Sequence, residues 1–114
     1  MKAVIKFIKE IEETTIPNIN ITRSTDGTTG TATFIFENPS IFYNVVSPQT
    51  EITGMFLIDE EGTLSTKDVN AKFIQGKPKI LQAIYIIKDN ENWDRFMRFM
   101  ERYSNENNLT FIRA

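Results

Sequence analysis

The sequence contains neither cysteine nor histidine. Zinc, copper, haem and iron–sulfur sites take their protein ligands chiefly from these two side chains, so only carboxylate sites for hard cations are left. Cysteine nucleophiles, Ser-His-Asp triads and histidine general bases are excluded as well. We therefore expect no cofactor, no metal and no disulfide, and we rank an enzyme below a binding protein.

Long hydrophobic runs are also missing. The longest apolar stretch, residues 83–87, is far shorter than the roughly 18 residues that a membrane-spanning helix needs. The first residues show neither a signal-peptide run nor an Arg/Ser-rich transit segment, so we expect the protein to act in the compartment where it is made. The net charge of −2 gives no overall cationic field, which predicts binding to protein rather than to nucleic acid or lipid, without direct membrane insertion.

The composition is that of an ordinary globular protein. With 114 residues, 40% of them hydrophobic and 25% charged, the chain is expected to form one domain over residues 1–114. Isoleucine occurs 16 times and leucine 4 times. This skew is typical of an AT-rich genome, such as that of many plastids.

Two β-hairpins are predicted from alternating apolar and polar residues. Residues 20–24 and 31–37 alternate at period two around the turn-forming residues 25–30. Residues 52–59 and 63–73 flank the acidic segment 59–62 (DEEG), whose glycine suits a short β-loop. The three acids lack the spacing of a calcium loop, so we interpret the segment as a solvated hairpin tip.

Three further segments are assigned to strands. Residues 79–88 follow a turn at residues 75–78 and carry apolar residues on both faces, which predicts a central strand. The first dozen residues fit both a helix and a strand, and we favour the strand. Residues 108–113 are predicted to form a last short strand.

One long helix is predicted at Asn90–Glu106, with Asp89 as its N-cap. Its large apolar residues fall within one arc of about 160° on a helical wheel. They are Trp93, Phe96, Met97, Phe99, Met100 and Tyr103. The predicted fold class is therefore α+β, mainly antiparallel β-hairpins packed against one C-terminal amphipathic α-helix.

The polar face of this helix carries the candidate partner-binding residues Arg95, Arg98 and Arg102. They lie within about 60° of one another on the wheel and can meet phosphates or acidic partner segments. The alternative is a solvated face whose arginines pair with neighbouring acids. Trp93 is interpreted as a core anchor rather than a stacking platform, because it begins the apolar stripe.

Several segments resemble the Psb28 family of photosystem II proteins in their order and spacing. They are Arg23-Ser24, Asp26-Gly27, Gly30, residues 36–39 (FENP), 51–55 (EITGM), 59–62 (DEEG) and 69–74 (VNAKFI), Gly76, Pro78, and above all residues 93–103 (WDRFMRFMERY). The resemblance covers nearly the whole chain. The sequence departs from the family pattern at Glu10, where glycine is expected, at Asn90, where proline is expected, and across residues 41–49.

The resemblance implies a peripheral assembly or repair factor without catalytic activity. Its implied partners are photosystem II subunits, namely the inner-antenna chlorophyll protein, reaction-centre proteins and cytochrome b559, at the cytoplasmic or stromal face of the thylakoid membrane. The residue skew and the absence of a transit segment favour a plastid-encoded protein, with a cyanobacterial origin as the alternative. A monomer is favoured.

Two modes of action follow. In the first, an exposed sheet edge accepts a strand from a loop or tail of a membrane protein. In the alternative, the apolar surface between helix and sheet binds a small molecule or a tetrapyrrole linked to chlorophyll supply. An enzyme ranks third, because the sequence supplies no set of residues for a reaction.

Overall fold

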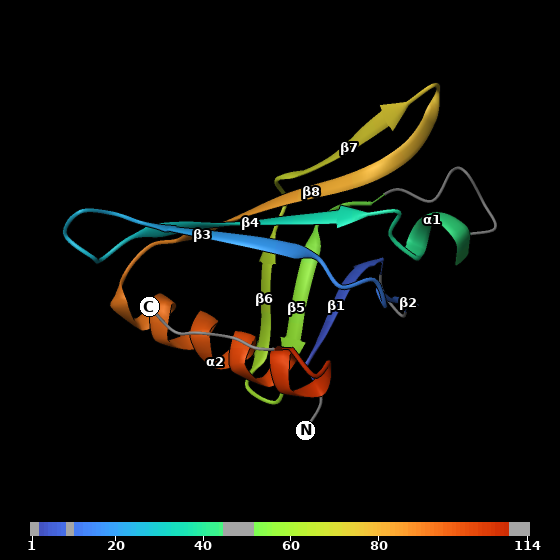
Figure 1. The fold of residues 1–114 in the computed structure, drawn as a ribbon. Coiled ribbons are helices and arrows are strands. Elements are labelled where there is room, and N and C mark those ends of the chain that lie inside the picture. Colours follow the sequence, from blue (N-terminus) through green and yellow to red (C-terminus); the bar gives the residue numbers. More distant parts are fainter. Residues whose placement is uncertain (1–2, 9–10, 45–51, 110–114) are drawn as a thin grey trace.

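The computed structural model describes residues 3–8, 11–44 and 52–109, and this part of the chain forms two antiparallel sheets and two helices (Figure 1). The elements follow in the order β1 (Val4–Ile8), β2 (Ile11–Glu12), β3 (Asn18–Arg23), β4 (Gly30–Glu37), α1 (Ile41–Asn44), β5 (Met55–Asp59), β6 (Gly62–Thr66), β7 (Val69–Ile74), β8 (Lys77–Ile87) and α2 (Asn90–Glu106). The predicted α+β class is confirmed.

The first sheet has the strand order β2-β1-β5-β6. Strands β5 and β6 form a tight hairpin in which Asp59 pairs with Gly62 across the loop Glu60–Glu61. The side chains that alternate toward the interior, Ile5 and Phe7 of β1 and Met55 and Leu57 of β5, are fully buried. The strand predicted for the first dozen residues is thus confirmed as β1, and the helical alternative is wrong.

The second sheet has the order β3-β4-β8-β7, so β8 is central, as predicted. Strand β4 pairs with β8 from Gly30 opposite Ile87 to Glu37 opposite Ile80. Because β4 ends there, the end of β7 and the start of β8 extend past it as a free hairpin, which rises away from the other elements in Figure 1. Its two-residue loop has Gln75 at φ 53° and Gly76 at φ 78°, the two positive φ angles of a type I′ turn.

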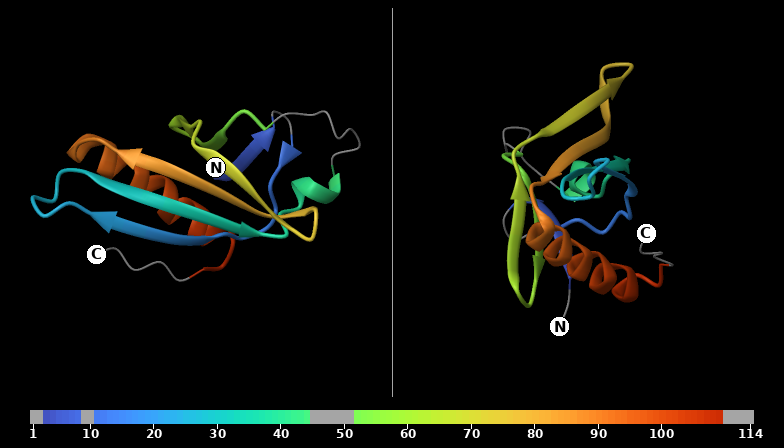
Figure 2. Two further views of the ribbon diagram at one scale, coloured as in Figure 1. Left: turned by 90° about the horizontal axis from the view of Figure 1, so that it is seen from above. Right: turned by 90° about the vertical axis from the view of Figure 1, so that its left-hand side faces the viewer.

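The predicted helix is confirmed as α2. The Asp89 carboxylate accepts a hydrogen bond from the backbone N–H of Asn92 at 2.8 Å, which caps the helix as expected. All six residues of the predicted apolar arc are buried. The helix packs across β5 and β8, and the two views in Figure 2 show it on one side of both sheets. None of the described helices has the length and apolar character that crossing a membrane demands.

Helix α1 was not predicted. Its start is held by Glu13, a buried residue whose carboxylate accepts hydrogen bonds from the backbone N–H groups of Ser40 (2.8 Å) and Ile41 (3.0 Å). A carboxylate that accepts the free amides at the start of a helix satisfies donors with no partner within the helix itself. The contact joins residues 27 and 28 positions apart, so local patterning did not indicate it.

The single strand predicted for residues 63–73 is wrong. Strand β6 ends at Thr66, and Lys67 and Asp68 carry the chain into the second sheet, where β7 begins at Val69. Thr66 organises this corner, because its hydroxyl donates to the carbonyl of Ile84 (2.7 Å) and accepts from the N–H of Asp68 (3.1 Å).

Two smaller predictions also need correction or remain open. Both faces of the strand at residues 79–88 were expected to be covered, but Ile86 is 58% exposed, because the outer face of β8 is uncovered near its end. The predicted strand at residues 108–113 falls largely outside the described residues. Within them, Asn108 adopts φ 56° in a turn and Leu109 is not part of a strand.

Candidate interaction surface

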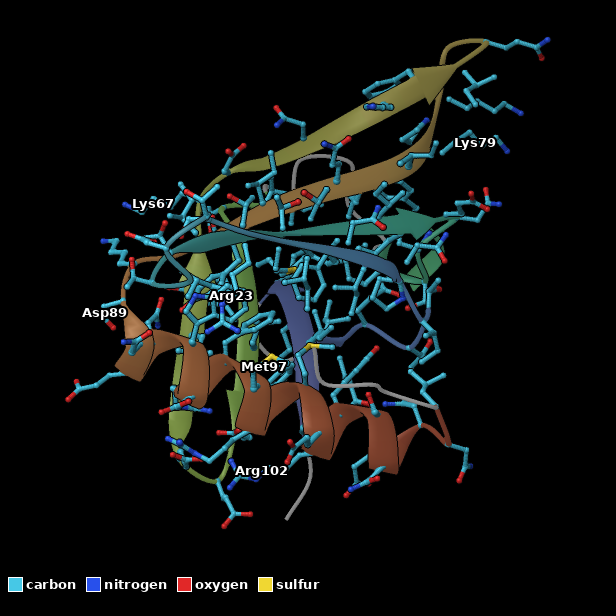
Figure 3. The ribbon with its side chains drawn as sticks, turned by 60° about the vertical axis from the view of Figure 1, so that its left-hand side comes forward. Arg23, Lys67, Lys79, Asp89, Met97 and Arg102 are labelled. Atoms are coloured by element: carbon cyan, nitrogen blue, oxygen red, sulfur yellow. The ribbon has the colours of Figure 1, made fainter. Side chains whose placement is uncertain are left out.

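The three arginines of α2 form an ion-pair network with the β5–β6 turn. Their spacing of three and then four residues places them on one helix face, directly beside the turn. The network comprises Arg95, Arg98, Arg102, Asp59, Glu60 and Glu61, and we call it the arginine–carboxylate cluster. Figure 3 shows Arg102 at the lower end of the molecule, close to this turn.

Asp59 is the buried centre of the cluster. Arg95 donates to both of its carboxylate oxygens, at 2.9 and 2.7 Å, and Arg102 donates to Oδ2 at 2.9 Å. The side chain of Asp59 has no exposed surface. Burial by itself would raise the pKa of Asp59, but the hydrogen bonds from Arg95 and Arg102 outweigh it and hold the pKa below its ordinary value.

Glu61 occupies the outer part of the cluster. Arg98 donates to both of its carboxylate oxygens at 2.8 Å, and Arg102 donates to Oε2 at 2.6 Å. These hydrogen bonds, chiefly the one from Arg98, lower the pKa of Glu61 to about 2. Arg98 keeps 44% of its side chain exposed and is the most accessible of the three arginines.

The acidic turn was expected to be a solvated hairpin tip, and for Asp59 this is wrong. The sequence separates Asp59 from Arg95 by 36 positions, so only the tertiary packing of α2 on the hairpin brings them together. Whether the arginine face binds a partner stays a prediction. Within the cluster the arginines already have acidic partners, and Arg98 is the one with most surface left for a contact with another molecule.

Trp93, near the start of α2, packs against Arg23 and Gly30 of the β3–β4 hairpin, which belong to the segments that resemble the family. Its ring is buried, as expected for a core anchor, and the guanidinium of Arg23 lies 4.6 Å from the ring centroid. The Nε of Arg23 donates to the carbonyl of Gly27 at 2.9 Å, which fixes the β3–β4 turn. A Cβ at Gly30 would lie 2.3 Å from Cζ2 of Trp93, so this position accepts only glycine without rearrangement.

The space between α2 and the sheets is filled by aromatic rings. The ring of Phe96 lies 6.2 Å from that of Phe34 in an edge-on arrangement and 5.3 Å from that of Tyr85 in a stacked one. Such pairs fill the interior and stabilise it beyond their burial alone. The apolar surface that the sequence suggested for a small molecule or tetrapyrrole is therefore occupied by the protein's own side chains.

The β7–β8 hairpin offers an open sheet edge. Within the described residues, the outer side of β7 pairs with no other strand. The N–H of Ile84 donates to the carbonyl of Asp68 at 3.0 Å, so the hydrogen-bonded pairs with β8 continue at Asn70 and Lys72. The N–H and C=O of Ala71 consequently point outward, where an added strand would meet them.

The end of this hairpin is exposed on all sides. Each residue from 71 to 78 is exposed, and Phe73 and Ile74 keep 64% and 52% of their surface. This feature was not predicted, because residues 63–73 were assigned to one strand that ended at Phe73. The available signal was the presence of lysines on both sides of the turn at Gln75 and Gly76, namely Lys72, Lys77 and Lys79.

The family model described as Psb28 protein matches residues 5–111, nearly the whole chain. The chain belongs to the Psb28 family. Similar proteins of this family, each named photosystem II reaction center Psb28 protein, occur in algae and cyanobacteria. The Trieres chinensis protein is 57% identical over 114 residues (100% of this chain and 99% of the relative), and the Synechococcus elongatus protein is 48% identical over 114 residues (100% of both).

The positions at which this Psb28 family member departs from the family pattern can be compared with the described structure. Asn90 stands where proline was expected, yet α2 begins there with Asp89 as its cap. Residues 41–44 form α1, whereas Glu10 and residues 45–49 lie outside the described residues. Two of the segments that carry the resemblance, the β3–β4 turn and the start of α2, meet at Arg23, Gly30 and Trp93.

Proposed function

We propose that this chain is a non-catalytic, peripheral assembly and repair factor that docks transiently on photosystem II intermediates. The proposed neighbours are the inner-antenna chlorophyll protein, reaction-centre proteins and cytochrome b559. The observation that carries the proposal is the family match over residues 5–111, together with relatives named as photosystem II reaction center proteins along their full length.

The absence of catalytic activity is proposed on the composition and on the cluster. The sequence lacks the two residues most often used in acid–base and nucleophilic catalysis. Hydrogen bonds from arginines lower the pKa values of the Asp59 and Glu61 carboxylates. Carboxylates with lowered pKa values are poorly suited to proton transfer at neutral pH. The site of action is proposed to be the stromal side of the plastid thylakoid, or the cytoplasmic side in a cyanobacterium.

Docking is proposed to use the outer edge of β7. An unpaired edge can bind an extended segment through main-chain hydrogen bonds, while alternate side chains supply specificity. On the opposite edge strand of the same sheet, β3, Ile19 and Ile21 pack against the core, so fewer of its side chains are free to contact a partner. In β7 only Val69 does so, and the rest of the strand is exposed.

The proposed function is tested by purifying the tagged protein from detergent-solubilised thylakoids. Recovery of reaction-centre subunits with the protein is the expected result. A chromophore that copurifies without any of these subunits would contradict docking and support the small-molecule alternative.

The choice of edge is tested by replacing Ala71 with proline. Proline removes the outward N–H that an added strand would use but leaves the hydrogen bonds to β8, and edge strands tolerate it. Comigration with photosystem II intermediates on native gels should be lost for Ala71→Pro and kept for Ala71→Val, which retains the N–H. If both variants comigrate like the wild type, β7 is not the edge.

The arginine face is proposed as a second contact, with Arg98 as its accessible member beside Arg95 and Arg102. Reversing the charge of Arg95 would place a carboxylate against buried Asp59, so a loss of binding could not be told apart from a loss of folding. Arg98 is more exposed and is therefore the arginine to change. Arg98→Glu should weaken association mainly at low salt, as expected for a pair at the rim of an interface. Unchanged comigration of Arg98→Glu at low and moderate salt would exclude this face.

A further inference from the structure

The overhanging end of the β7–β8 hairpin has a charge opposite to that of the rest of the protein. Residues 69–80 contain three lysines, Lys72, Lys77 and Lys79, and no acid. The whole chain carries −2, so the remainder carries −5. Within the described part of the chain, none of these lysines takes part in an ion pair. The positive charge is therefore available for an external partner.

Two large apolar side chains lie among these lysines at the very end of the hairpin. Phe73 pairs with Pro78, and Ile74 with Lys77, next to the two-residue turn. Since the pairing of β4 with β8 stops opposite Ile80, β4 does not extend alongside either of these two described residues. Figure 2 shows the hairpin end as the outermost point of the molecule in the right-hand view, and Figure 3 shows Lys79 on the same projection.

We infer that this hairpin end contacts the surface of an anionic lipid bilayer, with Phe73 and Ile74 at the level of the head groups. The tip is convex, and a bilayer accommodates a convex apolar tip without the matching pocket that a protein partner would need. Lysine stems can lie along apolar surface while their ammonium groups remain in the head-group region, where aromatic residues also partition. No segment needs to cross the bilayer.

The remaining charge gives this contact a direction. A body of net −5 is repelled by an anionic surface, whereas the hairpin end is attracted to it, so the protein should approach tip first. The expectation of binding to protein rather than lipid rested on the net charge, which does not show how the charges are distributed over the molecule. Among the described residues, the arginines of the arginine–carboxylate cluster pair with Asp59, Glu60 and Glu61, whereas none of the three hairpin lysines forms an ion pair.

Flotation with protein-free vesicles tests the inference. The wild type should float with phosphatidylcholine vesicles that contain phosphatidylglycerol, more at low than at high salt, and should not float with phosphatidylcholine alone. Each lysine near an anionic surface contributes about five-fold in affinity, so Lys72→Ala with Lys77→Ala should lower binding about 25-fold. Phe73→Ser with Ile74→Ser should lower it at both salt concentrations.

Matched controls lie elsewhere on the chain. Ile86 is 58% exposed, and Lys67 is exposed in the connection that precedes β7, so Ile86→Ser and Lys67→Ala should float like the wild type. A wild type that does not float, or controls that lose as much binding as the hairpin variants, would overturn the inference. Circular dichroism of each variant should show that the fold is retained, because the substitutions lie outside the turn residues Gln75 and Gly76.

This contact goes beyond the proposed docking function, and the two can fail separately. Vesicles contain no photosystem II, and detergent-solubilised photosystem II intermediates offer no bilayer. If the hairpin variants lose comigration with those intermediates while the wild type does not float, the hairpin end is a protein contact and the lipid inference is wrong. If the wild type floats but does not comigrate, docking fails and the lipid contact stands.

Discussion

Replacing Asp59 by asparagine removes the charge at the centre of the arginine–carboxylate cluster while nearly keeping the shape of the side chain. The wild-type carboxylate accepts three hydrogen bonds from Arg95 and Arg102 and has no exposed surface. Asparagine keeps one acceptor oxygen but turns an amide N–H₂ toward a guanidinium. We expect a large loss of stability for a change of so few atoms.

The magnitude follows from how far each partner is buried. Removing one member of a fully buried ion pair costs about 3–5 kcal/mol, and a hydrogen bond to a charged group contributes about 1.5–3 kcal/mol. Here Arg95 and Arg102 keep some contact with solvent, and Arg102 retains Glu61, so both can be partly compensated. We therefore expect Asp59→Asn to lower the free energy of unfolding by about 2–4 kcal/mol.

Urea denaturation followed by circular dichroism measures this difference. Glu61→Gln is the matched control, because it removes a charge from the same turn at a solvent-accessible position and should cost much less. Combining Asp59→Asn with Arg95→Met should cost less than the sum of the two single changes, since they interrupt the same contact. An Asp59→Asn variant no less stable than Glu61→Gln would refute the reasoning.

Three further predictions concern the core and the pH dependence. Phe96→Ala or Met100→Ala should lower the free energy of unfolding by about 2–5 kcal/mol. Urea should unfold each variant in one cooperative transition, as expected if residues 1–114 form a single domain. A change within about 0.5 kcal/mol would show that α2 is not packed as described. Gly30→Ala should cost about 1–3 kcal/mol, because its Cβ would meet the Trp93 ring at 2.3 Å, and unaltered thermal unfolding would contradict this. The pKa of Glu61 is lowered from 4.5 to about 2 in the folded state, so its stabilising contribution is present above about pH 4.5 and is lost toward about pH 2, where the folded carboxylate also takes up a proton. Denaturation midpoints at about pH 5 and pH 3 should therefore differ less for Glu61→Gln than for the wild type, and equal differences would argue against the Arg98 contact.

The local elements were largely predictable because their signals lie within a few residues of one another. The helix was predicted with its cap and its buried face, since Asp89 and the apolar arc are both local patterns. The hairpin β3–β4 was predicted for the same reason. The strand at residues 63–73 was not divided correctly, because the corner at Thr66 depends on a hydrogen bond to Ile84, which is 18 residues away.

The candidate surfaces were less predictable, because each arises from the register of strands or from packing between distant segments. The arginines were identified as one face of the helix, but their carboxylate partners come from a turn 36 to 43 positions away. The exposed hairpin end exists because β4 stops opposite Ile80 while β7 and β8 continue. Strand lengths at this level depend on tertiary pairing, so alternation of residues along one segment could not indicate which end would project.

The two proposed contacts other than the β7 edge lie at opposite ends of the molecule, and this makes their independence testable. Arg102 and Lys79, labelled in Figure 3, mark the cluster and the hairpin end, which are also apart in both views of Figure 2. Within the part of the chain that the structure describes, the two sites share no hydrogen bond or ion pair. For distant sites without shared partners, changes in free energy add within about 0.3–0.5 kcal/mol. We expect Arg98→Glu to weaken comigration with detergent-solubilised photosystem II and to leave vesicle flotation unchanged. Lys72→Ala with Lys77→Ala should weaken vesicle flotation and leave comigration unchanged. In native membranes, which offer both surfaces, the combined variant should lose the sum of the two effects. A combined loss no larger than the greater single loss would mean that both variants disrupt one and the same attachment.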